Sequence, residues 1–340
     1  MTDQIYMKRC IELARKALGK TYPNPFVGSV IVYNDTIIGE GFHAKAGENH
    51  AEINAINSVV NKDLLKDSTI YVSLEPCSHF GKTPPCANKI VEIGFKKVVI
   101  GTLDSHKKVN GRGKEIVEEA GIEVISGVLE NECRELNKRF FTFHQKKRPF
   151  IILKWAQSND GFLDKDFKRT QISNGLVKQF VHKMRSEEHA ILVGTQTALS
   201  DHPSLTTREI SGRNPVRILI DLRLKVPRDF KIYNDKAPTL VFNAEKNSIE
   251  ENVKFIKIEK ENFLQNLIQK LYEEQIQSVI IEGGSFTLTQ FIKAGLWDEA
   301  IIIKNEDLNV GSGTKAPEFN FKPNRTENFR DNIVEFYSNK

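Results

Sequence analysis

The chain has 340 residues, and at roughly 150 residues per domain this length predicts two domains, each with its own hydrophobic core. Hydrophobic residues make up 39% of the chain and charged residues 27%, a composition too apolar for an intrinsically disordered protein. The 49 Lys and Arg exceed the 44 Asp and Glu by only five, so the charge balance does not predict a nucleic-acid partner.

The sequence also argues against export and membrane insertion. No apolar run approaches the roughly 18 residues of a membrane helix, and the N-terminal residues lack the basic and apolar regions of a signal peptide. Four cysteines are too few for a disulfide scaffold of this length and predict a reducing compartment. We therefore expect a cytoplasmic protein without a membrane partner.

The N-terminal part alternates helical and strand patterns, which predicts an α/β sheet with parallel crossovers. Asn34 and Asp35 separate two extended runs and indicate a hairpin. The expected strands cover residues 27–33, 36–42, 69–74, 97–101 and 122–128; the expected helices cover residues 5–18, 50–60, 86–93, a stretch that ends at Gly121, and 130–143.

A polar, basic stretch at residues 144–149 ends in Pro149 and predicts a domain boundary, with domains at residues 1–145 and 149–340. The second part again has an α/β pattern. Its clearest expected helix covers residues 259–274, and residues 197–208 are expected to form a polar loop. The expected strands of this part are residues 150–155, 190–193, 216–221, 239–242 and 278–281.

The most informative segment contains His50, Glu52, Cys77 and Cys86. A catalytic zinc ion takes three imidazole or thiolate ligands and one water molecule, and His50, Cys77 and Cys86 supply three ligands. Cys86 opens an expected helix, whose N-terminal N–H groups should lower the pKa of its thiol. Glu52 lies close to this group and is free to carry protons. The pattern favours hydrolytic deamination of a nitrogen heterocycle, with Glu52 as the acid and base.

Two alternatives remain open on the residues alone. The usual deaminase signature ends in two cysteines separated by two residues, whereas Cys77 and Cys86 are separated by eight. A closed structural zinc site with His79 as fourth ligand, or two unrelated cysteines, would also contain these residues, but neither gives Glu52 a role. Cys10 and Cys133 lie within helical patterns and are expected to be core thiols.

Four strings carry a resemblance to a known family. They are residues 22–28 (YPNPFVG), 39–43 (GEGFH), 46–52 (AGENHAE) and 74–86 (LEPCSHFGKTPPC). With these strings the chain resembles the bifunctional deaminase/reductases of riboflavin biosynthesis, in which the long spacer between the two cysteines is characteristic. The resemblance covers essentially the whole chain and is densest between Pro23 and Gly113.

The resemblance implies a fold and two reactions. It implies a cytidine-deaminase-like three-layer α/β/α domain followed by a dihydrofolate-reductase-like α/β domain. The first domain would deaminate a phosphoribosylaminopyrimidine with one zinc ion, and the second would reduce the ribosyl group to ribityl with NADPH. The only partners expected are this small-molecule substrate and further copies of the chain, in a dimer or tetramer.

The resemblance also implies roles for residues around the deaminase site. His50, Cys77 and Cys86 would bind zinc, and Glu52 would shuttle the proton. The positions that match substrate contacts are Asn24, His43, Lys82 and Asp104. On the residues alone, Asn24 between two prolines also fits a turn, and Lys82 also fits a solvated loop lysine.

In the second domain, residues 280–285 form an expected strand that leads into a Gly-rich turn, a weak indication of a phosphate-binding helix start. Arg185 ends a helical pattern, a place that favours a cation with or without a ligand. The resemblance assigns cofactor contacts to Ala156, Ser173, Thr197, Asp201, Gly284, Ser285, Phe286 and Thr287; reductase substrate contacts to Arg185, Leu205, Arg208 and Glu282; and possible reductase catalysis to Lys154 and Asp160.

The chain departs from the family pattern at several places. Family members usually carry Trp-Ile-Thr at residues 171–173, where this chain has Gln-Ile-Ser, and an Ala-Pro-containing strand end at residues 304–307, where it has Lys-Asn-Glu-Asp. His202 follows Asp201 where Asn or Asp is more usual, and residues 104–107 lack the prolines common in that loop. The reductase interpretation therefore rests on fewer matching residues than the deaminase interpretation.

Three functional hypotheses follow. The first is the bifunctional enzyme, with deamination before reduction. The second is a deaminase of nucleosides or nucleic-acid bases with an unrelated second domain. The third is a zinc-stabilised binding protein, or a deaminase only, in which the second domain is a degenerate, non-catalytic reductase-like module.

Overall fold

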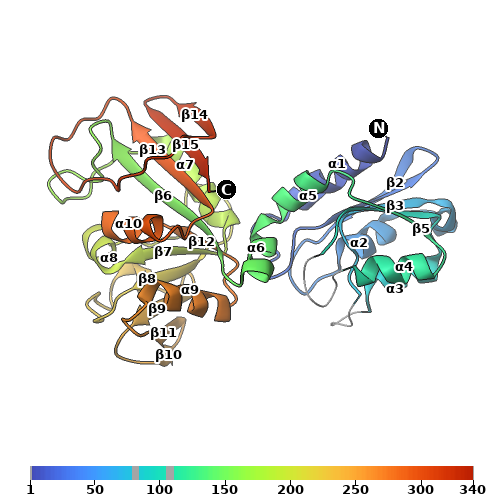
Figure 1. Ribbon diagram of the computed structural model, residues 1–340, viewed down its shortest axis with the longest axis horizontal. Coiled ribbons are helices and arrows are strands. Elements are labelled where there is room, and N and C mark those ends of the chain that lie inside the picture. Colours follow the sequence, from blue (N-terminus) through green and yellow to red (C-terminus); the bar gives the residue numbers. More distant parts are fainter. Residues whose placement is uncertain (1, 79–83, 105–110, 340) are drawn as a thin grey trace. The chain divides into compact units, whose positions relative to one another are not determined.

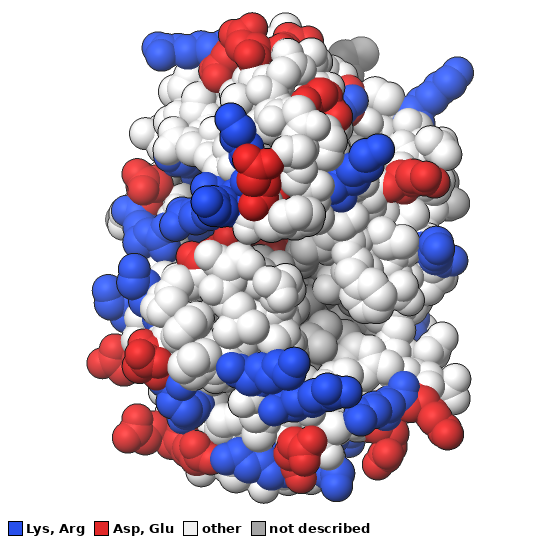
Figure 2. Space-filling view, turned by 90° about the vertical axis from the view of Figure 1, so that its left-hand side faces the viewer, with Lys and Arg blue, Asp and Glu red and all other residues white. Residues whose placement is uncertain are grey.

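The structure is a computed structural model that describes residues 2–78, 84–104 and 111–339. The chain forms two compact units, Met1–Lys147 and Arg148–Lys340. Their division falls inside the polar stretch at residues 144–149. None of the helices in the described ranges is both long and apolar enough to span a membrane. Figure 2 shows basic and acidic side chains interleaved over one face of the molecule.

The first unit contains a five-stranded sheet in the order β2-β1-β3-β4-β5. Strands β3, β4 and β5 are parallel, whereas β1 is antiparallel to both β2 and β3. Asn34 and Asp35 have positive φ angles of 43° and 58° and form the tight β1–β2 turn, which confirms the hairpin. The strands are β1 (Gly28–Tyr33), β2 (Thr36–Phe42), β3 (Thr69–Leu74), β4 (Lys97–Thr102) and β5 (Glu123–Ser126).

Helices cover both faces of this sheet and confirm the three-layer α/β/α architecture (Figure 1). On one face, α1 (Thr2–Arg15) and α5 (Glu130–Leu136) enclose a core that includes Met7 and Tyr71. On the other face, a second core includes Ile56, Ile90 and Val117. The helices of that face are α2 (Ala51–Ser58), α3 (Cys86–Ile93) and α4 (Arg112–Glu119), and a short 3-10 turn η1 (Lys62–Asp67) precedes β3.

The prediction of a single helix at residues 130–143 is wrong. The structure has α5 and then α6 (Lys138–Lys146), separated at Asn137, whose φ of −106° is not helical. The fully buried Asn137 side chain accepts from the N–H of Phe26 at 2.8 Å and donates to the Phe26 carbonyl at 2.9 Å. This tertiary contact fixes the side chain of Asn137 at the break between the two helices.

The second unit contains a ten-stranded sheet in the order β10-β11-β9-β8-β7-β12-β6-β13-β15-β14. All neighbours from β11 to β13 are parallel, and the pairs at both ends are antiparallel. The strands are β6 (Phe150–Ser158), β7 (Ala190–Gly194), β8 (Val216–Ile220), β9 (Thr239–Asn243), β10 (Ser248–Glu250), β11 (Val253–Lys257), β12 (Ser278–Ile281), β13 (Glu299–Asn305), β14 (Arg325–Phe329) and β15 (Asn332–Ser338).

Helices also cover both faces of the second sheet. Residues of α7 (Gly175–Glu187) and α8 (Thr195–Asp201) pack into one core, and residues of α9 (Phe263–Glu273) and α10 (Ser285–Lys293) pack into the other. A short 3-10 turn, η2 (Lys231–Tyr233), precedes β9.

Two expectations for this unit are wrong. Residues 197–208 were expected to form a loop, but residues 197–201 belong to α8. Ala198 of this helix is fully buried against the sheet. The helix expected from residue 259 begins at Phe263, because Asn262 has a positive φ of 48°.

Candidate functional site

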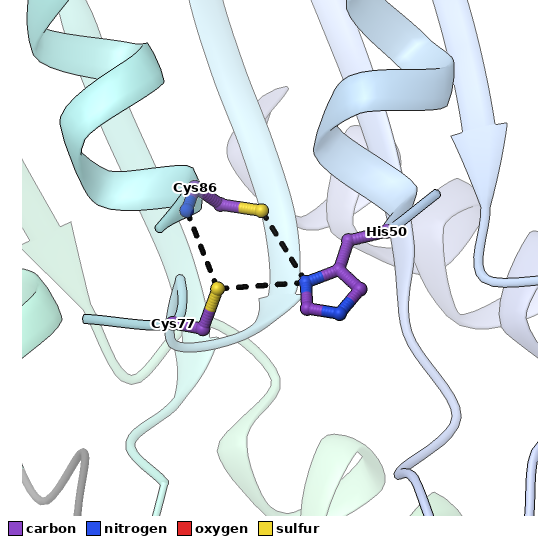
Figure 3. A group of neighbouring side chains, drawn as sticks. All are labelled: His50, Cys77 and Cys86. Atoms are coloured by element: carbon purple, nitrogen blue, oxygen red, sulfur yellow. Dashed lines mark hydrogen bonds between the residues drawn. The ribbon is translucent and has the colours of Figure 1, made fainter. Parts of the chain in front are cut away.

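Three potential metal ligands meet at the carboxyl end of β3. Cys77 follows this strand, His50 immediately precedes α2, and Cys86 is the first residue of α3. The Nδ1 atom of His50 lies 3.4 Å from the Sγ atom of Cys77 and 3.4 Å from that of Cys86 (Figure 3). All three ligand atoms lie within 4.8 Å of one another, so helices and a strand distant in sequence bring one imidazole and two thiols together.

This donor set fits zinc. Zinc bonds of about 2.0–2.3 Å in a tetrahedron place neighbouring ligand atoms about 3.5–3.8 Å apart, close to the separations between His50 and the two thiols. One nitrogen and two sulfur ligands leave a fourth position, as in catalytic zinc sites. His79, the alternative fourth ligand, lies outside the described residues.

The two thiols differ in their ionisation. The pKa of Cys77 is well below its usual range, because Cys86 and His50 donate hydrogen bonds to its sulfur, as does the backbone N–H of Cys86 at 3.3 Å. The pKa of Cys86 is raised by the hydrogen bond to Cys77 and by burial. The backbone N–H at this helix start reaches the sulfur of Cys77 rather than that of Cys86.

Glu52 lies in the first turn of α2, and only 4% of its surface is exposed. Burial, together with the negative charge of Cys77, raises the pKa of Glu52 to about 7. A bound metal cation would act in the opposite direction and favour the carboxylate. A carboxyl group poised in this way can accept and return a proton near neutral pH.

Asn24 and His43 meet beside the metal ligands. The Nδ2 atom of Asn24 lies 3.0 Å from Nε2 of His43, and Nδ1 of His43 lies 3.1 Å from the Asn49 carbonyl oxygen. The His43 ring packs edge-on against the His50 ring, with centroids 5.3 Å apart. Burial lowers the pKa of His43, so the ring is neutral and donates to Asn49 while it accepts from Asn24.

Of the two other expected substrate residues, the structure describes Asp104 but not Lys82. Asp104 is buried just beyond β4, and its N–H donates to the carboxylate of Glu75 at 3.0 Å. Lys82 lies outside the described residues. Glu75 was not singled out in the sequence, although a carboxylate directly between a buried strand and a Pro-Cys pair is an unusual arrangement.

In the second unit, Lys154, Arg185 and Glu282 form a buried charge cluster. Glu282 follows β12; its Oε1 lies 3.0 Å from Nζ of Lys154 on β6, and its Oε2 lies 2.7 Å from Arg185 on α7. Burial alone would raise the pKa of Glu282, but the positive charges of Arg185 and Lys154 lower it to about 2. The Nε atom of Arg185 is buried and has no hydrogen-bond partner among the described residues.

Arg208 is tied to this cluster through His182. The N–H of Arg208 donates to Nδ1 of His182 at 2.8 Å. Burial, followed by the charges of Arg185 and Arg208, lowers the pKa of His182 to about 4. Leu205 is buried with a positive φ of 54°. Sequence reasoning missed His182, although its spacing of three residues from Arg185 on one helix would have placed both on the same face.

The glycine-rich turn after β12 is tightly packed. A Cβ atom on Gly283 would lie 2.6 Å from Cβ of Thr287, and one on Gly284 would lie 3.3 Å from Oγ1 of Thr197. Gly284 precedes α10, and no side chain caps that helix. A close backbone approach at an uncapped helix start fits a phosphate group of a dinucleotide such as NADPH.

The remaining reductase residues have varied surroundings. Ala156 and Ser173 are partly buried, whereas Phe286 on α10 is 78% exposed. Asp201 ends α8, and Ser285 begins α10. The carboxylate of Asp160 accepts from the hydroxyl of Ser158 at 2.6 Å and from the N–H groups of Val310 and Gly311 at 3.1 Å and 2.8 Å, contacts typical of a loop anchor.

The sequence and structure of the chain match known proteins over its whole length. Residues 1–102 match the cytidine and deoxycytidylate deaminase zinc-binding region, and residues 149–305 match the RibD C-terminal domain. Riboflavin biosynthesis protein RibD of Aquifex aeolicus is 40% identical, with 98% of each chain covered. RibD of Escherichia coli is 34% identical, with 95% of this chain and 96% of that protein covered.

Two solved structures extend the match. A diaminohydroxyphosphoribosylaminopyrimidine deaminase/5-amino-6-(5-phosphoribosylamino)uracil reductase from Thermotoga maritima is 36% identical, with a TM-score of 0.90 and 98% of each chain covered. RibD from Acinetobacter baumannii is 32% identical, with a TM-score of 0.89 and the same coverage. With a zinc-binding deaminase domain and a reductase domain on one polypeptide, the chain belongs to the RibD family, the bifunctional deaminase/reductases of riboflavin biosynthesis.

Proposed function

We propose that the first unit hydrolytically deaminates 2,5-diamino-6-(5-phosphoribosylamino)pyrimidin-4-one and that the second unit then reduces the ribosyl group of the product to ribityl with NADPH. One observation carries this proposal. His50 meets two thiols immediately before α2, and the buried Glu52 lies in the first turn of that helix. The names and full-length coverage of the relatives support the choice of substrate.

In the first reaction, His50, Cys77 and Cys86 would hold the zinc ion, which would lower the pKa of a water molecule bound to it. Glu52 accepts a proton from the attacking water and delivers it to the departing amino group. A carbon–oxygen bond forms and the carbon–nitrogen bond breaks, so the products are the pyrimidinedione and ammonia. Burial of Glu52 keeps this proton from exchanging with bulk solvent.

Asn24, His43 and Asp104 are the proposed substrate contacts of the described part of the first unit. Asn24 offers amide edges that suit a pyrimidine base, and His43 fixes its orientation through the 3.0 Å contact. Asp104 is a buried acceptor for substrate N–H or O–H groups. Lys82 remains a prediction as a phosphate contact.

In the second reaction, the turn at Gly284 and the side chains of Thr197 and Thr287 are the proposed sites for the NADPH phosphates, and NADPH supplies the hydride. Glu282 holds Lys154 and Arg185 beside each other, and the place of Arg185 in this charge cluster supports a role for it in binding substrate phosphate. Lys154 is the proposed proton donor. The contacts of Asp160 support a role in holding the loop at Val310 rather than in proton transfer.

Deamination is proposed to precede reduction, with the substrate phosphate as a handle for both sites. The free state of all four cysteines supports a reducing, cytoplasmic setting. A homodimer or tetramer is supported by the exposed edges of the two α/β sheets, such as the short edge strand β10.

One reaction tests the proposal. Purified zinc-loaded protein is mixed with the phosphoribosylated diaminopyrimidinone and NADPH, and ammonia release and NADPH oxidation are followed together. We expect ammonia first and then NADPH loss, in equal amounts. Ammonia without NADPH oxidation would favour the deaminase with a degenerate reductase-like binding module, which the family matches do not favour, and no ammonia would overturn the substrate assignment.

A further inference from the structure

Glu75 connects two segments that border the deaminase site. It lies between β3 and the Pro76-Cys77 pair, and only 4% of its surface is exposed. Its Oε2 atom accepts from the N–H groups of Asp104 and Gly111, both at 3.0 Å. Its Oε1 atom accepts from Gly113 at 2.8 Å and from Lys114 at 3.3 Å. One carboxylate therefore holds both Asp104, two residues beyond β4, and the start of α4.

Backbone N–H groups, rather than a cationic side chain, compensate the negative charge of the Glu75 carboxylate. No Lys, Arg or His side chain forms an ion pair with it within residues 2–78, 84–104 and 111–339. A buried carboxylate without such a partner depends on its hydrogen bonds, and N–H groups at a helix N-terminus are well suited to this. The N–H groups of Gly113 and Lys114 come from the first turn of α4.

A close backbone contact reinforces the connection. A Cβ atom on Gly113 would lie 2.0 Å from the carbonyl oxygen of Pro76, a separation that only glycine avoids. The start of α4 is therefore pressed against the backbone immediately before the metal ligand Cys77. This contact and the hydrogen bonds from Gly111, Gly113 and Lys114 act between the same two segments.

We propose that Glu75 is a positioning residue of the deaminase, which fixes the substrate-contacting residue Asp104 relative to the metal ligand Cys77. The inference rests on the proposed function, because it takes Asp104 as a substrate contact. Glu75 itself touches neither substrate nor metal. Its effect on the reaction passes through the backbone of Asp104 and of α4.

The test is the isosteric variant Glu75→Gln in the full chain. The amide turns one acceptor oxygen into a donor that faces two N–H groups, so two of the four hydrogen bonds are lost. Ser68→Ala is the control, since Ser68 is equally buried at the opposite end of β3, where its hydroxyl donates to the Leu64 carbonyl at 2.6 Å. NADPH oxidation with the deaminated substrate reports whether the second unit of each variant is intact.

We expect Glu75→Gln to lower deaminase kcat/KM by about 10- to 100-fold, mainly through KM, with unchanged zinc content and unchanged reductase activity. Backbone hydrogen exchange at Asp104, Gly111 and Gly113 should become faster in Glu75→Gln and stay unchanged in Ser68→Ala. An unchanged KM, or zinc loss in proportion to activity, would overturn the proposal.

The exchange measurement separates this inference from the proposed function. If the wild-type protein does not deaminate the pyrimidine, the proposed substrate is wrong, while unchanged exchange at Asp104 and Gly111 in Glu75→Gln still overturns the positioning role. Faster exchange at these residues supports it independently of turnover.

Discussion

The side-chain amide of Asn305 donates a hydrogen bond to the carbonyl oxygen of Ile172 at 2.8 Å. Each residue lies in a segment that the resemblance leads us to regard as a departure from the family pattern, Gln-Ile-Ser at residues 171–173 and Lys-Asn-Glu-Asp at residues 304–307. Asn332, which is fully buried, also donates to the Ile172 carbonyl, at 3.3 Å. The two departures are therefore one structural feature, in which amide side chains hold the backbone next to Ser173.

Asn305→Ala tests whether this feature serves cofactor binding. The change leaves one donor on the Ile172 carbonyl instead of two and loosens the backbone at Ser173, so we expect the KM for NADPH to rise about 3- to 10-fold. Asn243→Ala is the control, because Asn243 is also buried and holds a turn after β9, three strands from β12. A similar rise in both variants would show that the effect is only a loss of stability.

Glu52→Gln tests the proton carrier of the deaminase. The amide keeps the size of the side chain but cannot accept the proton of the attacking water, so we expect deamination to fall on the order of 10²–10⁴-fold. Zinc content, measured by metal analysis, should equal that of the wild type. NADPH oxidation with the deaminated substrate should be unaffected, and retained ammonia release would exclude Glu52 as the proton carrier.

Glu282→Gln tests the charge cluster of the reductase. The change leaves Lys154 and Arg185 as neighbouring buried cations without an anion. Removing one partner of a buried ion pair lowers the free energy of unfolding by about 3–5 kcal/mol, and we expect a loss of this size. Chemical denaturation followed by fluorescence measures this loss. Glu274→Gln is the control at a pair with Lys254 that is more exposed than the cluster of Glu282, and we expect it to cost less than about 1 kcal/mol.

A buried histidine predicts how stability depends on pH. The Nδ1 atom of His189 accepts from the N–H of Gln277 at 3.2 Å, and burial, followed by the charge of Arg213, lowers its pKa to about 4. The unfolded chain, with a histidine pKa of about 6.5, binds the proton first. The contribution of neutral His189 to the free energy of unfolding is thus fully present above about pH 6.5 and is lost as the pH falls towards 4. The largest loss is on the order of 3 kcal/mol.

The variant His189→Asn provides the comparison, since its side-chain oxygen can accept from Gln277 but does not titrate in this range. Denaturation curves between pH 4 and pH 7 should fall less steeply for His189→Asn than for the wild type. Parallel pH profiles would contradict the assignment of this dependence to His189.

Local patterns were enough to predict most elements and the metal ligands. The helix at residues 86–93 and the strand at residues 278–281 have the bounds expected from their periodicity and flanking residues. The cluster of His50 with two cysteines was expected from spacing, because metal chemistry limits which residue types occur together. These features depend on residues close in sequence or on a distinctive set of ligands.

Contacts between distant segments account for the rest. The break at Asn137 depends on Phe26, which is 111 residues away, and the Asn305–Ile172 contact spans 133 residues. The backbone N–H of Cys86 points to the sulfur of Cys77, a direction that the sequence does not give. Glu75 was missed for the same reason, since its partners are in another segment.

The two sheets have separate hydrophobic cores, and the carboxylates of Glu52 and Glu282 lie in different units. Damage to Glu52 therefore leaves the scaffold of the reductase intact, and damage to Glu282 leaves that of the deaminase intact. In genetic terms, we expect two gene copies that each carry one of these lesions to complement each other when the intermediate is released from one chain and taken up by the other. Although both activities lie on one polypeptide, a single substitution is thus not expected to abolish both.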